Sequence, residues 1–145
     1  MTNTECRSLA VEYIWTFIGR PYRWGGDDPM EGFDCSGLVV EVLQGVGLLP
    51  HKTDFTADAL WRRFNAWTLK APVAGALVLW MNAAGQATHV EMAINSKYTI
   101  GASGGGSVTT SLERAIKQNA FIKIRPFNYR GSNYKIVDPF ASIGE

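Results

Sequence analysis

The chain has 145 residues, a length that suits one domain, and we predict a single domain spanning residues 1–145. Its 14 Lys and Arg residues nearly balance 13 Asp and Glu residues, and the net charge of +1 argues against a nucleic-acid-binding surface. No apolar stretch reaches the roughly 18 residues that a membrane-spanning helix needs, so we expect no membrane insertion.

Residues 1–6 lack a basic segment followed by an apolar one, so we predict no secretory signal. The expected protein is cytoplasmic when made. It then stays there, leaves by a specialised route, or travels in a larger particle.

Two cysteines, Cys6 and Cys35, are too few for a disulfide framework, and a reducing compartment disfavours a bond between them. A zinc site would have to combine them with His51 and His89, but none of the usual ligand spacings is present. We therefore predict no metal and no cofactor.

The first half of the chain predicts helices. Thr2 and Glu5 resemble a capping box before a helix over residues 4–19, which Gly19 and Pro21 would end. The apolar face predicted for this helix consists of Leu9, Ala10, Tyr13, Ile14, Phe17 and Ile18.

A Gly- and Pro-rich loop over residues 20–34, which includes Pro29, leads to a second helix over residues 35–46. A shorter third helix is predicted over residues 56–65.

The second half of the chain predicts strands. Residues 76–81 form a continuous apolar run typical of a buried strand, and residues 88–94 alternate in polarity. His89 and Glu91 share the face of this second strand that lies opposite Val90.

A return strand is predicted over residues 98–103, one or two helical turns over 109–118 and a late strand over 121–125, while the tail from residue 131 has no assignment. Helices that precede strands indicate an α+β fold, with an antiparallel sheet covered by helices on one side.

Cys35 is the first candidate catalytic residue. It lies between turn residues and the apolar residues of the second helix, in the run Gly32-Phe33-Asp34-Cys35-Ser36-Gly37-Leu38-Val39. A thiol at a helix N-terminus lies at the positive end of the helix dipole, which favours the nucleophilic thiolate.

A cysteine nucleophile needs a base, usually histidine, and the chain has two. His51 follows the far end of the helix that Cys35 begins, about 18 Å away at a rise of about 1.5 Å per residue. We therefore interpret His51 as a solvated loop residue and His89 as the candidate base.

The chain contains three segments in this order: Arg20-Pro21-Tyr22-Arg23-Trp24-Gly25-Gly26, then Gly32-Phe33-Asp34-Cys35-Ser36-Gly37-Leu38-Val39, then Thr88-His89-Val90. Together they resemble the NlpC-type cell-wall peptidases, which are papain-like cysteine enzymes, and the resemblance covers about residues 5–125. It implies a papain-like fold, with N-terminal helices packed on a small antiparallel sheet. It also implies hydrolysis of peptidoglycan stem peptides, typically between γ-D-glutamate and a diamino acid.

The resemblance assigns roles to individual residues. Cys35 would be the nucleophile, and His89 the base that later protonates the leaving amine. The backbone N–H of Cys35 would help to hold the oxyanion. Tyr22 would line the cleft, while Asp34 and Ser36 would lie near the amino end of the substrate.

Tyr22 and Asp34 have plain structural alternatives, and for Tyr22 the alternative is ordinary aromatic packing. Asp34 also suits the N-cap of the second helix, a role that is compatible with substrate binding. Trp24, beside Tyr22, is expected to be an ordinary packing aromatic.

The chain departs from the family pattern at Gly101. Family members usually carry His, Asn or Gln there, on the strand after the histidine, to orient the imidazole. Candidates for this role are Ser103 and Thr99 on the return strand, Glu91 on the strand of His89, water and a backbone carbonyl. Glu91 is otherwise expected to be an exposed carboxylate.

The leading hypothesis is therefore a cysteine endopeptidase or amidase that acts on peptidoglycan. A catalytic domain without a separate wall-binding repeat favours a component of a bacteriophage tail. The alternative is an effector that a secretion machine delivers to other cells. A second hypothesis is a structural or binding domain with lost activity, which Gly101 supports and the intact Cys35 and His89 oppose. An acyltransferase or deamidase has no support beyond this Cys–His pair.

Overall fold

The computed structural model of the chain describes residues 1–28 and 32–143, so Pro29 of the predicted loop lies outside the described residues. The described residues form the α-helices α1 (Asn3–Trp15), α2 (Cys35–Gly45), α3 (Ala57–Phe64) and α4 (Leu112–Gln118). Two 3-10 helices, η1 (Asn65–Trp67) and η2 (Pro139–Ile143), follow α3 and β8. Each predicted helix is confirmed. In this described part of the chain, no helix is long and apolar enough to cross a membrane.

The sheet has six antiparallel strands in the described residues, in the order β3-β8-β4-β5-β6-β7. Their bounds are β3 (Thr68–Leu69), β4 (Leu77–Met81), β5 (Ala87–Ala93), β6 (Tyr98–Ser103), β7 (Phe121–Pro126) and β8 (Tyr134–Val137). A separate hairpin joins β1 (Asp27–Asp28) to β2 (Gly32–Phe33). The four predicted strands are confirmed, while β3 and β8 were not predicted because neither short run carries a clear period.

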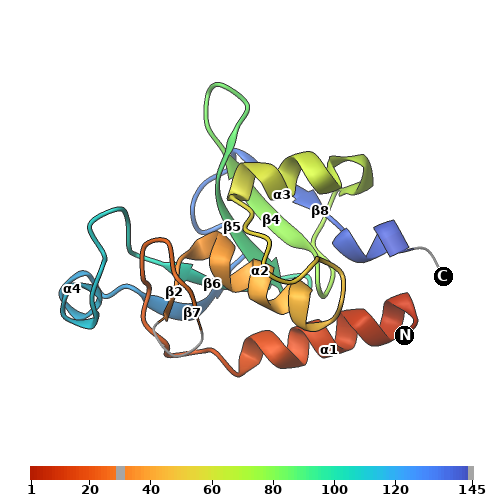
Figure 1. The fold of residues 1–145 in the computed structure, drawn as a ribbon. Helices are drawn as coiled ribbons and strands as arrows, with labels where there is room; N and C mark the ends of the chain where they lie inside the picture. The colour runs from red at the N-terminus through yellow and green to blue at the C-terminus, as the bar shows by residue number, and fades with distance from the viewer. Residues whose placement is uncertain (29–31, 144–145) are drawn as a thin grey trace.

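Helices α1, α2 and α3 cover one face of the sheet, as predicted (Figure 1). Their apolar side chains form the main core with inward-facing strand residues, which include Leu77, Leu79, Val90, Met92 and Ile100. A smaller cluster lies on the other face, where the segment before β8 packs on the sheet; its members include Val78, Trp80, Ile136, Phe127 and Tyr129. The architecture is therefore the predicted α+β arrangement.

Helix α1 is shorter than predicted. Its N-cap is confirmed, since the Thr2 hydroxyl accepts from the backbone N–H of Glu5 at 3.1 Å. The helix ends at Trp15 rather than at residue 19. Leu9 and Ile18, which were predicted to lie on the buried face, are 43% and 38% exposed. The face of this segment that is buried in the core is narrower than predicted and consists of Cys6, Ala10, Ile14 and, after the end of the helix, Phe17.

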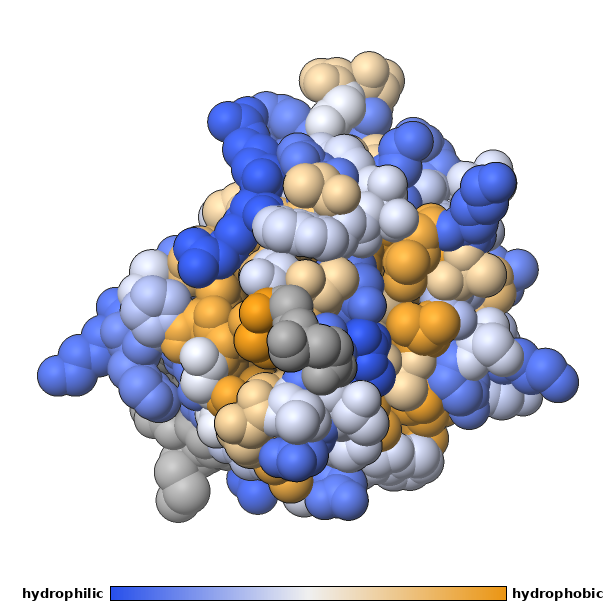
Figure 2. All heavy atoms as spheres, turned by 90° about the vertical axis from the view of Figure 1, so that its right-hand side faces the viewer, coloured by the Kyte–Doolittle hydropathy of each residue, from blue (hydrophilic) through white to orange (hydrophobic). Residues whose placement is uncertain are grey.

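Arg7 ties α1 to the C-terminal segment. Its guanidinium donates to the Asp138 carboxylate at 2.8 Å and to the Ala74 carbonyl at 2.9 Å, and it lies 5.3 Å from the centre of the Phe140 ring. The described ends of the chain therefore share one side of the molecule. Figure 2 shows this side, where hydrophobic and polar side chains are interspersed.

Asp34 fixes the point at which α2 begins. One carboxylate oxygen accepts from the N–H of Gly37 at 2.7 Å, and the other accepts from the N–H of Gly25 at 3.0 Å. A side chain at Gly37 would collide with the carbonyl oxygen of Gly26, so glycine permits the close approach of the loop to the helix. The capping and the close approach together make Cys35 the first residue of α2.

Candidate active site

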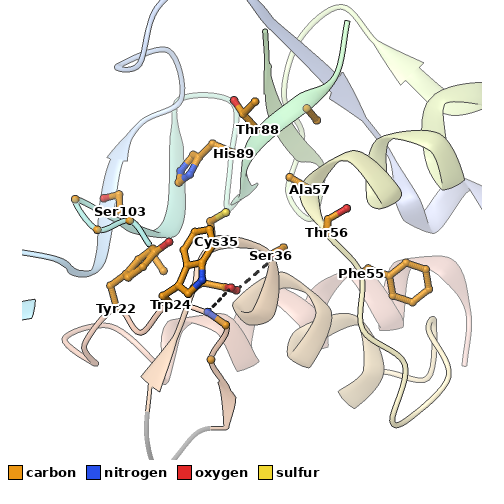
Figure 3. A pocket seen from close by; sticks show the side chains of 18 of the residues that line it. Tyr22, Trp24, Cys35, Ser36, Phe55, Thr56, Ala57, Thr88, His89 and Ser103 are labelled. Carbon is orange, nitrogen blue, oxygen red and sulfur yellow. Dashed lines mark hydrogen bonds between the residues drawn. The ribbon is translucent and has the colours of Figure 1, made fainter. Parts of the chain in front are cut away.

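A cavity of about 400 Å³ lies over the N-terminus of α2 (Figure 3). It is lined by Cys35 and Ser36 of α2, by the loop before α2, by residues 54–57 before α3, by residues 102–106 at the end of β6, by His89 and by Arg130. Segments distant in sequence thus converge on one thiol.

Cys35 and His89, predicted as nucleophile and base, meet in this cavity. Cys35 is partly exposed, and its side chain lies close enough to the His89 imidazole to change the pKa of His89. Figure 3 shows the His89 side chain above the sulfur of Cys35. The other histidine, His51, is exposed in a turn beyond α2, as predicted.

A β-bulge lies next to His89. Trp80 pairs with His89, but the next residue of β4, Met81, pairs with Ala87, so Thr88 is an extra residue on β5. A bulge changes the direction in which neighbouring side chains point. This local geometry places His89 at the end of the sheet that faces the start of α2, with its ring 5.5 Å from that of Trp80.

Glu91 is buried, and the expectation of an exposed strand carboxylate is wrong. Its Oε2 atom lies 2.7 Å from Nε2 of His89 and accepts from the Tyr129 hydroxyl at 2.6 Å. Its Oε1 atom accepts from the Thr99 hydroxyl at 2.6 Å. Of the candidate orienting groups, Glu91 is therefore the side chain that contacts the imidazole, whereas Thr99 contacts Glu91.

The His89–Glu91 contact changes the pKa of both groups. Burial disfavours the imidazolium, but the neighbouring Cys35 and the hydrogen-bonded Glu91 outweigh burial and raise the pKa of His89 above its ordinary 6.5. Burial also disfavours the carboxylate, but the hydrogen bond and charge of His89 outweigh it, with help from Thr99 and Tyr129, and lower the pKa of Glu91. The pair is therefore an imidazolium and a carboxylate at mildly acidic pH.

The predicted cleft residues also line the cavity. Tyr22 is 5% exposed, and burial together with nearby Cys35 and Asp34 raises the pKa of Tyr22 far above its ordinary 10.0, so its hydroxyl is a donor at neutral pH. Burial raises the pKa of Asp34, although the N–H groups of Gly37 and Gly25 oppose this. Ser36 lies beside Asp34, with its hydroxyl 3.5 Å from the carboxylate.

Several lining residues were not predicted, or were given another role. Trp24 was expected to be an ordinary packing aromatic, but it is 53% exposed and lines the cavity. Asp54 and Arg130, which also line the cavity, and Tyr129, which contacts Glu91, lie in segments without a motif, so the sequence offered no signal for them. In the described residues, no three His, Cys, Asp or Glu side chains gather as metal ligands, and both cysteines are free thiols.

The model of the NlpC/P60 family matches residues 19–126, which is most of the chain. The chain belongs to the NlpC/P60 family. The resemblance predicted from the Tyr22, Cys35 and His89 segments is thereby confirmed.

Curated relatives in the family are longer than this chain. Murein DD-endopeptidase MepH of Escherichia coli K12 is 58% identical over 35 residues, which are 24% of this chain and 13% of MepH. Peptidoglycan endopeptidase RipB of Mycobacterium tuberculosis is 32% identical over 133 residues, covering 78% of this chain and 52% of RipB. The chain thus spans about half or less of the length of these two relatives.

The fold also matches solved structures of the family. A crystal structure of an NlpC/P60 family protein from Bacillus cereus superposes with a TM-score of 0.72 and 20% identity, over 92% of this chain and 40% of that chain. At this identity the match concerns the fold, and it confirms the predicted papain-like α+β architecture.

The His89–Glu91 pair predicts a specific pH dependence of stability. The raised pKa of His89 contributes stability that is complete below pH 6.5 and is lost as the pH rises through the folded-state value. The lowered pKa of Glu91 contributes stability that is complete above pH 4.5 and is lost as the pH falls through the folded-state value. We therefore expect Glu91→Gln to lower the free energy of unfolding most between pH 4.5 and 6.5, by about 2 kcal/mol.

Urea denaturation of the wild type and Glu91→Gln from pH 4 to 9 measures this difference. Glu113→Gln on the exposed part of α4 is the matched control, and its effect should be small throughout. A Glu91→Gln effect that is constant with pH, or largest at pH 9, would contradict the assignment.

Proposed function

We propose that this chain is a cysteine endopeptidase that hydrolyses peptidoglycan stem peptides. The observation that supports the proposal most is the contact of Cys35 at a helix N-terminus with a buried His89 that is itself bound to Glu91. The names of MepH and RipB, which describe endopeptidases of the cell wall, agree with this chemistry.

In the proposed reaction, the sulfur of Cys35 attacks the scissile carbonyl carbon and forms a thioester after the C–N bond breaks. Nε2 of His89 is held by Glu91, so Nδ1 is the nitrogen available to the thiol. His89 takes the thiol proton and gives it to the leaving amine. Water then attacks the thioester, with His89 as the base, and the carboxylate product and free thiol are released.

Two donors are available for the negative charge on the carbonyl oxygen. The backbone N–H of Cys35 lies in the first turn of α2, where it has no intrahelical acceptor. The Tyr22 hydroxyl, protonated at neutral pH, is the second. Donors fixed before the reaction stabilise the developing charge without reorganisation.

The proposed bond is the one between γ-D-glutamate and the diamino acid. This specificity rests on the resemblance of the Tyr22, Asp34 and Ser36 positions, and the name of MepH, a DD-endopeptidase, gives the alternative. Delivery of the domain by a phage tail or a secretion machine stays a prediction.

Digestion of purified sacculi, followed by mass spectrometry of the fragments, tests both reaction and bond. We expect the wild type to release stem-peptide fragments with a new amino terminus at the diamino acid, and Cys35→Ala to release none, because the nucleophile is gone. Cys6→Ala is the control and should retain activity, since Cys6 is buried in the core away from the cavity. Activity in Cys35→Ala would reject the mechanism, and cleavage between the diamino acid and D-alanine would reject the bond.

Arg130 is the proposed binding group for a substrate carboxylate. It lines the cavity and is close enough to Tyr22 and Tyr129 to affect the pKa of each, whereas Asp34 and Asp54 supply negative charge beside α2. A stem peptide carries both free carboxylates and an amino group, so this distribution of charge complements it.

Replacement of Arg130 should therefore weaken substrate binding. We expect Arg130→Gln to raise KM for a soluble stem peptide about tenfold, with little change in kcat, because one charge-assisted hydrogen bond is lost. Arg114→Gln on α4, outside the cavity, is the matched control. An unchanged KM would remove Arg130 from the binding site.

A further inference from the structure

Gly101 is a glycine for reasons of space. Its backbone is not in the left-handed region, so no conformational constraint demands glycine. A Cβ built on Gly101 would collide with Cγ and Cδ of Glu91 and would lie 2.8 Å from Oε2. The Glu91 side chain thus fills the volume that a side chain at position 101 would occupy.

The register of the sheet explains this exclusion. Met92 pairs with Ile100 and Ala93 with Thr99 across β5 and β6, a register that sets Gly101 opposite Glu91. Directly opposed side chains of an antiparallel pair share one face of the sheet and are neighbours. A polar side chain at 101 and the carboxylate of Glu91 would therefore compete for the same position against His89.

We infer that the orienting group of the His89 imidazole has moved across the strand pair, from position 101 on β6 to Glu91 on β5, and that Gly101 is the space this exchange requires. The inference rests on the proposed function for its effect on activity. It makes Glu91 a positioning residue, which stays ionised and exchanges no proton in the reaction.

The surroundings of Glu91 fit a positioning role. The carboxylate is fully buried and has a hydrogen bond from each of His89, Thr99 and Tyr129, so its orientation is fixed from three sides. Burial and the charge of Glu91 raise the pKa of Tyr129 to about 12, which keeps its hydroxyl a donor at working pH. The guanidinium of Arg125 on β7 lies 5.3 Å from the centre of the Tyr129 ring, within the range of a cation–π contact.

The first test is a histidine titration that needs no catalysis. In Cys35→Ala protein without a histidine tag, NMR follows two imidazoles, and exposed His51 is an internal reference. We expect Glu91→Gln to lower the pKa of His89, because Glu91 helps to raise it in the wild type. Tyr129 and Arg130, the other titratable or charged groups beside this pair, are retained in both proteins. An unchanged His89 pKa in the folded Glu91→Gln protein would overturn the inference.

The second test exchanges the two positions. Glu91→Ala should lower kcat by about tenfold to a thousandfold with little change in KM, since a thiol nucleophile depends less on an oriented base than a serine does. Gly101→Glu alone should also lower kcat, because two carboxylates cannot occupy one volume. The double variant Glu91→Ala with Gly101→Glu should have a kcat at least tenfold higher than that of Glu91→Ala alone.

Glu113→Gln on α4 is the control for loss of a carboxylate distant from the cavity and should retain full activity. Gly101→Glu protein with wild-type activity, or a double variant no better than Glu91→Ala, would overturn the exchange. If the wild type hydrolyses no peptidoglycan but its His89 titration depends on Glu91, the proposed function fails and the positioning of His89 by Glu91 stands.

Discussion

The buried contact between Glu91 and His89 is the interaction on which the rest of the site depends. A lone carboxylate without exposed surface would be strongly unfavourable, and so would an imidazolium in the same place. Each group makes the charged form of the other favourable, and Thr99 and Tyr129 satisfy the remaining lone pairs of the carboxylate. In the proposed mechanism, the second nitrogen of His89 is then available to take the proton of the Cys35 thiol.

The fold supplies both partners from rigid elements. Asp34 caps α2, and the close contact between Gly26 and Gly37 packs the first turn of α2 against the preceding loop. The backbone position of Cys35 is therefore fixed. His89 is on a central strand of the sheet, next to a bulge. Sites built on helices and strands hold their geometry better than sites built on loops. Arg130, which is proposed to bind a substrate carboxylate, lies in a loop at the cavity instead.

Local sequence patterns were sufficient for the elements that carry the site. The capped helix at Cys35, the alternating strand at His89 and the return strand were all predictable, because each has a clear period and clear end signals. The ends of the chain were less predictable. Strand β8 lies between β3 and β4, and its strand conformation depends on pairing with these distant segments, which the four residues of β8 alone do not indicate.

The orienting residue shows the limit of reasoning from one sequence. Glu91 was one of several candidates, and its charge suggested an exposed position. Its burial depends on the absence of a side chain at Gly101, ten residues away, and on hydroxyls from β6 and from the segment before β8. The missing polar residue at 101 therefore reflects space taken by Glu91, which weakens the argument for a decayed, purely structural domain.

The central claim is that His89 activates the thiol of Cys35, and the rate of alkylation measures this directly. With iodoacetamide at pH 6 to 7 and mass spectrometry to separate the two cysteines, the account predicts that Cys35 reacts far faster than buried Cys6. It also predicts that His89→Ala removes most of this advantage. Equal rates at the two cysteines, or a Cys35 rate unaffected by the loss of His89, would contradict the account.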